Sequence, residues 1–141
     1  MAELYIDAEN AIIGRLGAHV AKRALLGDTV KVLNCEKAII SGRKESNVEK
    51  YHHAMKERGR PAKGPYYSRM PDRFVRRVIR GMLPHKKVRG RDAYSRIMCY
   101  IGIPEEFKNQ KLIKIAEADI SKLKAINRAT VGEVCKALRQ K

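Results

Sequence analysis

The segment from Pro71 to Pro84 constrains the fold most, because arginine and large apolar side chains alternate along it with the period of an α-helix. Its basic side chains recur at spacings of three and four residues, at Arg73, Arg76, Arg77 and Arg80. Its apolar side chains occupy the complementary positions, at Phe74, Val75, Val78, Ile79 and Met82. Pro71 suits the first position of a helix, and Gly81 followed by Pro84 ends it. The pattern predicts an amphipathic helix that buries its apolar face in a core and turns its arginine face outward.

The arginine face of this helix favours a polyanion as its partner. Like charges three or four residues apart on a helix repel one another by about a few tenths of a kcal/mol for each pair. A group outside the helix should therefore offset that cost. A solvated surface is the alternative, yet solvated faces usually mix positive with negative charges. Because the planar guanidinium matches phosphate oxygens and is weakly hydrated, we expect this face to bind phosphate groups.

The positive charge of the chain is concentrated around this helix. Residues 56–96 contain 14 basic and three acidic side chains, which leaves a net charge of only +5 for the rest of a chain whose total is +16. A one-sided charge of this size and a pI of about 10.1 indicate a nucleic-acid partner, and less strongly an anionic membrane surface. No apolar run approaches the roughly 18 residues that span a bilayer, and no signal peptide opens the chain. We therefore expect an intracellular, cytoplasmic protein.

The sequence contains few residues suited to catalysis or to metal binding. Its three cysteines, Cys35, Cys99 and Cys135, are widely spaced within apolar stretches, which favours reduced core thiols over a zinc site. Phosphate-binding Gly-rich loops with Lys-Ser/Thr, nucleophile elbows and His-Glu-x-x-His motifs are missing. The acids are scattered, so we expect no enzyme, no metal, no cofactor and no small-molecule substrate. A metal-dependent nuclease and a membrane-surface protein remain as rival classes.

The remaining patterns predict an α/β layered domain. We expect strands at Leu4–Asp7, 29–34, 38–40 and 112–115, and helices at 12–26, 44–56, 92–101 and from a capping box at 130–133 to Leu138. The strands at 29–34 and 38–40 could form a hairpin or could belong to a parallel sheet. Gly14 and Gly17 within the first helix suggest the close approach of another backbone or of RNA. With no linker or repeat to divide it, the chain reads as one domain over residues 1–141, with a basic extension at about 56–96 and a C-terminal tail of mixed charge at about 117–141.

The candidate RNA-binding residues extend beyond the arginine helix. A loop before it and a basic loop after it, at 85–91, would continue the same surface, while Arg15 and Lys22 form a smaller stripe on the first helix. Two adjacent tyrosines in the first loop could stack on unpaired bases or could anchor the loop to the core. The full set comprises Arg15, Lys22, Arg43, Lys44, Arg58, Arg60, Lys63, Tyr66, Tyr67, Arg69, Arg73, Arg76, Arg77, Arg80, Lys86, Lys87, Arg89 and Arg91.

Several short motifs resemble one family of ribosomal proteins. The residues Ile79-Arg80-Gly81-Met82-Leu83-Pro84, then Arg89-Gly90-Arg91 and Ile97-Met98-Cys99-Tyr100-Ile101-Gly102, are similar to the L13 family of the large ribosomal subunit. The likeness extends to Gly14-Arg15-Leu16 and Ile40-Ser41-Gly42-Arg43-Lys44, and so covers nearly the whole chain. Cys99 stands where a small aliphatic residue is more usual. The ending at Ala129-Thr130-Val131-Gly132-Glu133 resembles the archaeal branch.

This resemblance implies both a fold and a role. The expected fold is a three-layer α/β/α domain with a four-stranded, mainly parallel sheet and a basic loop-helix extension. The implied role is a structural one, binding large-subunit ribosomal RNA of the 23S type early in assembly, beside neighbouring ribosomal proteins. The surface that the resemblance assigns to RNA coincides with the basic extension that the charge pattern selects.

Overall fold

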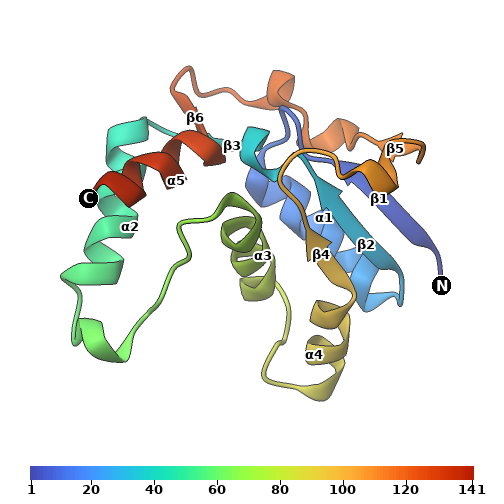
Figure 1. Ribbon diagram of the computed structural model, residues 1–141, viewed down its shortest axis with the longest axis horizontal. Helices are drawn as coiled ribbons and strands as arrows, with labels where there is room; N and C mark the ends of the chain where they lie inside the picture. Colours follow the sequence, from blue (N-terminus) through green and yellow to red (C-terminus); the bar gives the residue numbers. More distant parts are fainter.

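The computed structural model describes residues 1–141, with the helices and strands following one another in an α/β order (Figure 1). The strands are β1 Glu3–Asp7, β2 Thr29–Leu33, β3 Ile39–Ser41, β4 Ile97–Cys99, β5 Leu112–Ile113 and β6 Arg128–Thr130. The α-helices are α1 Ile13–Leu25, α2 Lys44–Lys56, α3 Pro71–Gly81, α4 Val88–Ser95 and α5 Val131–Gln140. Short 3-10 helices include η1 Cys35–Lys37, η2 Pro61–Lys63 and η3 Glu105–Phe107. The predicted helices at 12–26, 44–56 and 71–81 are confirmed, as are the first and last predicted strands.

Four parallel strands form the main sheet, in the order β4-β2-β1-β5. Ile6 pairs with Val32, and Val32 pairs in turn with Cys99. Val30, Val32 and Ile97 are fully buried on the face that α1 covers, where they join Leu16 and Val20 in the core. The α/β class and the four-stranded parallel sheet are thus confirmed.

The two faces of this sheet are covered differently. Helix α1 packs against one face together with α3 and α4, and Figure 1 shows α1 behind the strands. On the opposite face, Phe107 of η3 lies 5.4 Å from the Tyr5 ring and 5.3 Å from the Tyr100 ring, measured between centroids. The Lys31 ammonium lies 4.7 Å from the Phe107 ring centroid. Phe107 therefore covers part of this face, in contact with Tyr5, Tyr100 and Lys31.

A second, smaller sheet joins a strand from the first third of the chain to one near its C-terminus. Strand β3 pairs with β6 in antiparallel fashion, with Ile40 opposite Ala129, and α2 packs on α5 beside it. The predicted strands at 29–34 and 38–40 therefore form neither a hairpin nor neighbours in one parallel sheet. Between them Asn34 adopts a left-handed conformation, with φ of 56°, and its amide donates to the buried Asp7 carboxylate at 2.8 Å. This turn and η1 redirect the chain from one sheet to the other.

The prediction of a helix over 92–101 is confirmed as far as Ser95 and is wrong beyond it. Helix α4 ends at Ser95, and Ile97–Cys99 forms β4 instead, with Ile97 and Cys99 buried and Met98 40% exposed. The alternation matches the period of a strand, and three residues are too few for a periodicity signal to stand out. The loop predicted over 85–91 is also partly wrong, because α4 begins at Val88.

Helix α5 completes the core from the C-terminal end of the chain. The predicted capping box is confirmed, because the Thr130 hydroxyl accepts from the Glu133 amide while the Glu133 carboxylate accepts from the Thr130 amide. Val131, Val134 and Leu138 are buried in the main cluster. The last part of the segment expected as a tail is therefore an integral layer of the fold.

The glycines of α1 differ in their surroundings. A Cβ on Gly17 would lie 3.0 Å from the Met82 sulfur, whereas Gly14 has nothing within 4 Å. The close approach at Gly17 is thus made by a side chain of the arginine-helix segment and not by a backbone. None of the helices combines the length and the apolar character that crossing a bilayer requires.

Candidate nucleic-acid interface

Helix α3 buries its apolar face as predicted. Phe74, Val75 and Ile79 are almost fully buried, whereas Arg73 is exposed and Arg76, Arg77 and Arg80 are half-buried. Because Phe74 belongs to the core, it is not available to insert into a lipid surface, as a membrane-surface protein would require. The arginines lie on the less buried side of the helix.

The four arginines of α3 fall into two pairs. Arg76 is held inside the protein: its Nε donates to the Ile97 carbonyl at 2.9 Å, and its guanidinium carbon lies 4.4 Å from the Tyr94 ring centroid. The guanidinium carbon of Arg77 lies 4.2 Å from the Tyr67 ring centroid. Arg73 and Arg80 make no ion pair or hydrogen bond with the protein. The protein itself therefore relieves part of the repulsion, and two guanidinium groups remain free for an external anion.

The loop between α2 and α3 is anchored by one of its two tyrosines. The Tyr67 ring meets the Tyr51 ring edge-on at 5.5 Å, and Tyr51 meets Phe74 at 5.0 Å, so an aromatic chain runs from the loop into the core. Burial raises the pKa of Tyr51, which keeps its ring neutral. Tyr66 is 67% exposed, and its hydroxyl donates to the Ala62 carbonyl. Tyr67 therefore anchors the loop to the core, which is one of the two predicted alternatives. Tyr66 is exposed and can contact a ligand.

The other end of the basic extension is carried by α4. Lys86, Lys87, Arg89 and Arg91 are all exposed. Gly90 allows α4 to sit directly on the preceding turn, because a Cβ there would lie 2.1 Å from the Pro84 carbonyl oxygen. This contact positions the basic side chains of α4 relative to those of α3.

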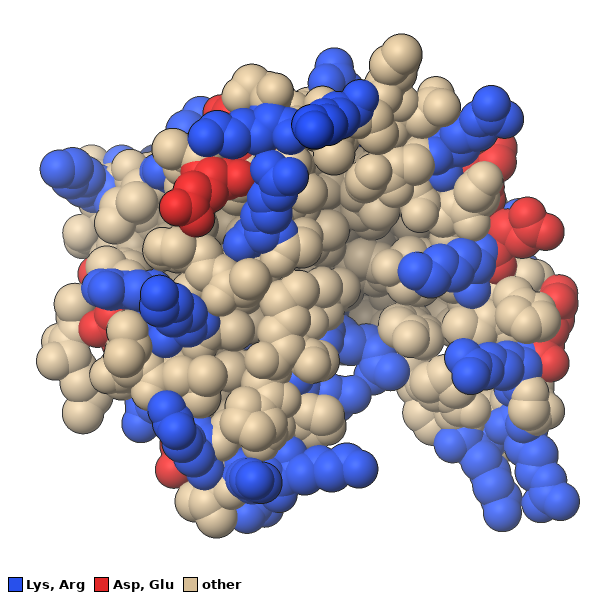
Figure 2. All heavy atoms as spheres, turned by 180° about the vertical axis from the view of Figure 1, so that it is seen from behind, with Lys and Arg blue, Asp and Glu red and all other residues tan.

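Three acid-free hollows connect these segments. The first contains Lys50, Tyr67, Arg77 and Arg80, and the second, across Tyr67, contains Lys56, Tyr66 and Arg69. A third hollow, between α1 and α4, brings Lys22 together with Arg89. Figure 2 shows basic side chains projecting from both lower corners of the molecule and lining the recess between them, where no acidic side chain appears. The structure therefore joins the loop, α3, α4 and one residue of α1 into one basic surface.

Other predicted residues lie apart from this surface or serve the fold. Arg15 donates to the Glu117 carbonyl at 3.3 Å. Arg43 and Lys44 are exposed at the start of α2, at the opposite end of that helix from the basic loop. Arg58, Arg60 and Lys63 are exposed on the loop itself. The backbone carbonyl of Arg69 accepts from the Arg139 Nε at 3.2 Å, which ties the end of the loop to α5.

Three residues of the basic surface were missing from the predicted set, namely Lys50, Lys56 and His85. Lys50 of α2 and His85 after α3 line the same hollow as Arg77 and Arg80. Helical periodicity places Lys50 on the outer side of α2 and carries no information about which segment faces it. Only the tertiary arrangement brings Lys50 and His85 to α3.

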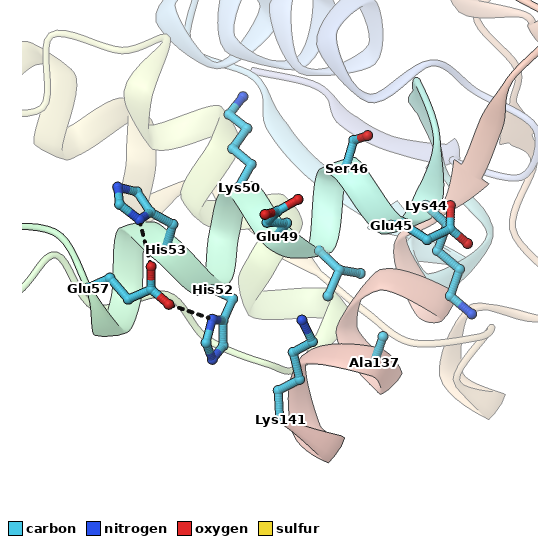
Figure 3. Close-up of a pocket in the computed structure, with 11 residues that line it drawn as sticks. Lys44, Glu45, Ser46, Glu49, Lys50, His52, His53, Glu57, Ala137 and Lys141 are labelled. Carbon is cyan, nitrogen blue, oxygen red and sulfur yellow. Dashed lines mark hydrogen bonds and ion pairs between the residues drawn. The ribbon is translucent and has the colours of Figure 1, made fainter.

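The largest hollow, of about 910 Å³, has a different character. It lies along the outer side of α2 and near the end of α5, and its lining mixes Glu45, Glu49 and Glu57 with lysines and histidines (Figure 3). His53 Nδ1 lies 2.9 Å from one Glu57 oxygen, and His52 Nδ1 lies 3.7 Å from the other. The hydrogen bond from His53 holds the pKa of Glu57 below its ordinary value. Because its three glutamates offset its three lysines, this hollow offers a polyanion no net positive charge.

The cysteines are free and buried, as predicted. Burial raises the pKa of Cys135 to about 11, and contact with Cys99 together with burial raises the pKa of Cys35 further. No group of three or more His, Cys, Asp and Glu side chains is arranged to hold a metal ion. The protein thus keeps the thiols of Cys35 and Cys135 protonated inside the core.

Comparisons with known proteins agree with the resemblance in the sequence. The sequence model of the family described as Ribosomal protein L13 matches residues 2–106. The chain is 48% identical to the large ribosomal subunit protein uL13 of Methanopyrus kandleri, over 94% of this chain and 84% of the relative. It is 44% identical to the uL13 protein of Methanosarcina barkeri, over 96% and 97%, and 42% identical to that of Archaeoglobus fulgidus, over 94% and 85%. These relatives are archaeal proteins, in line with the predicted branch.

Proposed function

Since this chain belongs to the ribosomal protein L13 family, we propose that its basic extension binds large-subunit ribosomal RNA of the 23S type, mainly through phosphate groups. The family consists of structural proteins of the large ribosomal subunit and not of enzymes, which agrees with the prediction from the sequence. The contacts with RNA, an early place in subunit assembly and a cytoplasmic location are parts of this proposal.

The observation that carries the proposal is the acid-free basic surface. Arg73 and Arg80 have no partner in the protein, and the neighbouring hollows contain cations and aromatic rings without a single acid. A protein in free solution gains nothing from such one-sided charge, whereas an RNA backbone supplies the missing counter-charge. Arginine, moreover, can contact two phosphate oxygens at once.

The contacts would position the protein more than they would read a sequence. Phosphates are the same at every nucleotide, so selectivity for one RNA region must come from the shape of the RNA and from unpaired bases. The surface is built on rigid helices, α3 and α4, whose relative placement is set by the close contact at Gly90. A folded RNA with matching spacing between its phosphates would fit this surface better than a flexible single strand.

Contacts with neighbouring ribosomal proteins would use the surfaces outside the basic extension. The C-terminal region has mixed charges, and the outer side of α2 has both acids and bases. Mixed charges of this kind are usual in protein interfaces and unfavourable for a polyanion. We therefore assign the RNA to one edge of the molecule and protein neighbours to the others.

A salt titration tests the proposal. The affinity for a large-subunit RNA fragment should fall steeply with salt, and replacing Arg73 and Arg80 with alanine should reduce the slope of log K against log salt by about 1.4, at about 0.7 for each phosphate contact. The matched control replaces Lys111 and Lys124, two exposed lysines outside the basic extension, and should leave the slope nearly unchanged. An unchanged slope in the arginine variant would remove this surface from the RNA interface.

A further inference from the structure

One hollow of the basic surface combines cations with an edge-on cluster of aromatic rings. It has a volume of about 300 Å³ and is bounded by α2, by the loop that precedes α3 and by α3 itself. Every titratable side chain of its wall belongs to a basic residue or a tyrosine: Lys50, Tyr51, Tyr67, Arg77, Arg80 and His85. The chemistry of this wall suits a ligand that is both flat and negatively charged.

The planar groups of the wall are held in place before any ligand arrives. The Arg77 guanidinium lies against the Tyr67 ring at 4.2 Å, and Tyr67 is fixed in turn by its edge-on contact with Tyr51 at 5.5 Å. The Lys50 ammonium lies 5.6 Å from the Tyr51 ring centroid. A base can stack on an arginine plane or an aromatic ring with a gain of about 1–3 kcal/mol, and little order must be imposed when the plane is already fixed.

The cations are placed to meet a phosphate at the same site. Arg80 has no partner in the protein, and His85 uses Nδ1 toward the Leu83 carbonyl at 3.3 Å, which leaves its Nε2 unused. Neither an aspartate nor a glutamate belongs to the wall, so no internal carboxylate competes for these groups. One nucleotide offers both features that the wall can recognise.

We propose that this hollow receives a single unstacked nucleotide of the bound RNA, with its base against Arg77 and its phosphate near Arg80 and Lys50. The proposal rests on the RNA-binding function above and adds a subsite to it. The hollow is at the lower end of the size range of small-ligand pockets, which suits one nucleotide and not a stacked pair.

The structure favours RNA over a free nucleotide as the source of this ligand. The adjacent hollow, of about 460 Å³, shares Tyr67 with the first and contains Lys56, Tyr66 and Arg69 without any acid. A polynucleotide leaving the first hollow would therefore meet further cations and an exposed tyrosine. A free nucleotide would use only the first hollow and would leave these groups unpaired.

The test compares two RNA hairpins that differ by one bulged nucleotide, each titrated with the full-length protein. The bulged position carries 2-aminopurine, whose fluorescence reports stacking on a protein group. The protein should bind the bulged hairpin about tenfold more tightly than the fully paired one, from stacking of a single base. The fluorescence of the bulged base should change on binding, while that of a paired 2-aminopurine should stay constant.

Two matched variants locate the effect. Arg77→Ala should abolish the preference for the bulged hairpin. Arg73→Ala removes the same charge outside the hollow, so it should lower the affinity for both hairpins equally and keep the preference. Lys50→Ala provides a second test, at an exposed position of α2. It should reduce the preference about threefold or more. If Lys50→Ala and Arg77→Ala both retain the full preference, the subsite is wrong.

The possible failures are distinguishable from one another. Equal, salt-dependent affinity of the wild-type protein for both hairpins would overturn the nucleotide subsite and leave the phosphate contacts standing. Binding to neither hairpin nor to the large-subunit RNA fragment would overturn the proposed function itself. Adenosine monophosphate serves as the third arm: affinity equal to that for the bulged hairpin would show that the hollow is a free-nucleotide site.

Discussion

Among single residues, arginines of one helix serve two different purposes, either fixing the helix to the sheet or remaining free for a ligand. Arg76 donates to backbone carbonyls of Ile97 and Tyr94 and so fixes α3 to β4, whereas Arg73 projects outward without a partner. The difference depends on which turn of α3 faces the sheet. Charge alone therefore does not identify the residues that bind RNA.

Replacing Arg76 with alanine should reduce the free energy of unfolding by about 2 kcal/mol, because charged hydrogen bonds contribute about 1.5–3 kcal/mol each. Urea denaturation measures this change. Arg73→Ala is the control, and its stability should stay within about 0.5 kcal/mol of the wild type. If both variants were equally stable, Arg76 would have no structural role.

The buried thiols predict a pH dependence of stability. The pKa of Cys135 is raised from 9.0 to about 11, so the folded protein holds this proton more tightly than the unfolded chain. The resulting stabilisation is complete below about pH 9 and should decline as the pH rises toward 11, by about 1.4 kcal/mol for each pKa unit.

Urea denaturation of the wild type and of Cys135→Ala at pH 8 and pH 10.5 isolates this contribution, since lysines and tyrosines titrate equally in both proteins. The wild type should lose more stability than the variant over this interval. A constant difference between the two proteins would contradict the raised pKa.

At the scale of elements, the position of α4 depends on a single missing side chain. Gly90 lies against the Pro84 carbonyl, and a Cβ there would come within 2.1 Å of the oxygen and 2.8 Å of the His85 nitrogen. Because these atoms belong to the backbone, no rotamer change can make room. This contact, together with the packing of α4 on α1 and β4, fixes where the basic residues of α4 lie.

Gly90→Ala should destabilise the protein by about 3 kcal/mol, since the turn at Pro84 must move or α4 must shift away from it. The midpoint of thermal unfolding measures the loss. Gly14→Ala is the matched control: nothing lies within 4 Å of its Cβ position, and removal of a helical glycine should stabilise the protein by up to about 1 kcal/mol. Equal midpoints for the two variants would refute the role of the contact.

At the scale of the whole molecule, charge and packing are divided between different regions. The parallel sheet with α1 forms one half, and α2, α5 and the small β3-β6 sheet form the other, with α3 in contact with both α1 and α5 (Figure 1). The basic extension runs from the end of α2 through α3 to α4. The RNA-binding surface that we propose is therefore built across both halves and depends on their relative placement.

The net charge of +16 predicts opposite effects of salt on the free and the bound protein. Self-repulsion destabilises the free protein, so raising NaCl from about 50 to 500 mM should increase its midpoint of thermal unfolding by screening that repulsion. In complex with RNA, bound ligand stabilises the folded state by about 2.7 kcal/mol at a concentration 100 times Kd, and salt removes this gain.

Circular dichroism can follow thermal unfolding at several salt concentrations, with and without the RNA fragment. These measurements check the predicted direction of the salt effect on each midpoint. The midpoint should rise with salt for the protein alone and should fall with salt for the complex. A bound protein whose midpoint is unaffected by salt would point to contacts that are not phosphate contacts.

Most of the fold could be predicted where a pattern extends over three or more helical turns. Helices α1, α2 and α3 agree with their predicted ranges, and α5 follows from its capping box. The short strand β4 could not be predicted, because three residues do not distinguish a period of 2.0 from one of 3.6. The partner strand of β3 could not be predicted either, because Ile39–Ser41 pairs with a strand almost ninety positions later in the chain.

Patterns along the chain were sufficient to predict the class of the fold, the helices with a long apolar stripe and the location of the excess charge, because periodicity and composition are local properties. The sequence also carried motifs specific enough to indicate the family. The roles of individual side chains depend on the folded arrangement, in which Arg76 and Tyr67 serve as anchors and Arg73 and Arg80 stay free. The same arrangement adds Lys50 and His85 to the basic surface. The physical reason is that the free energy of each cation depends on the groups of distant segments that folding brings within a few ångströms of it.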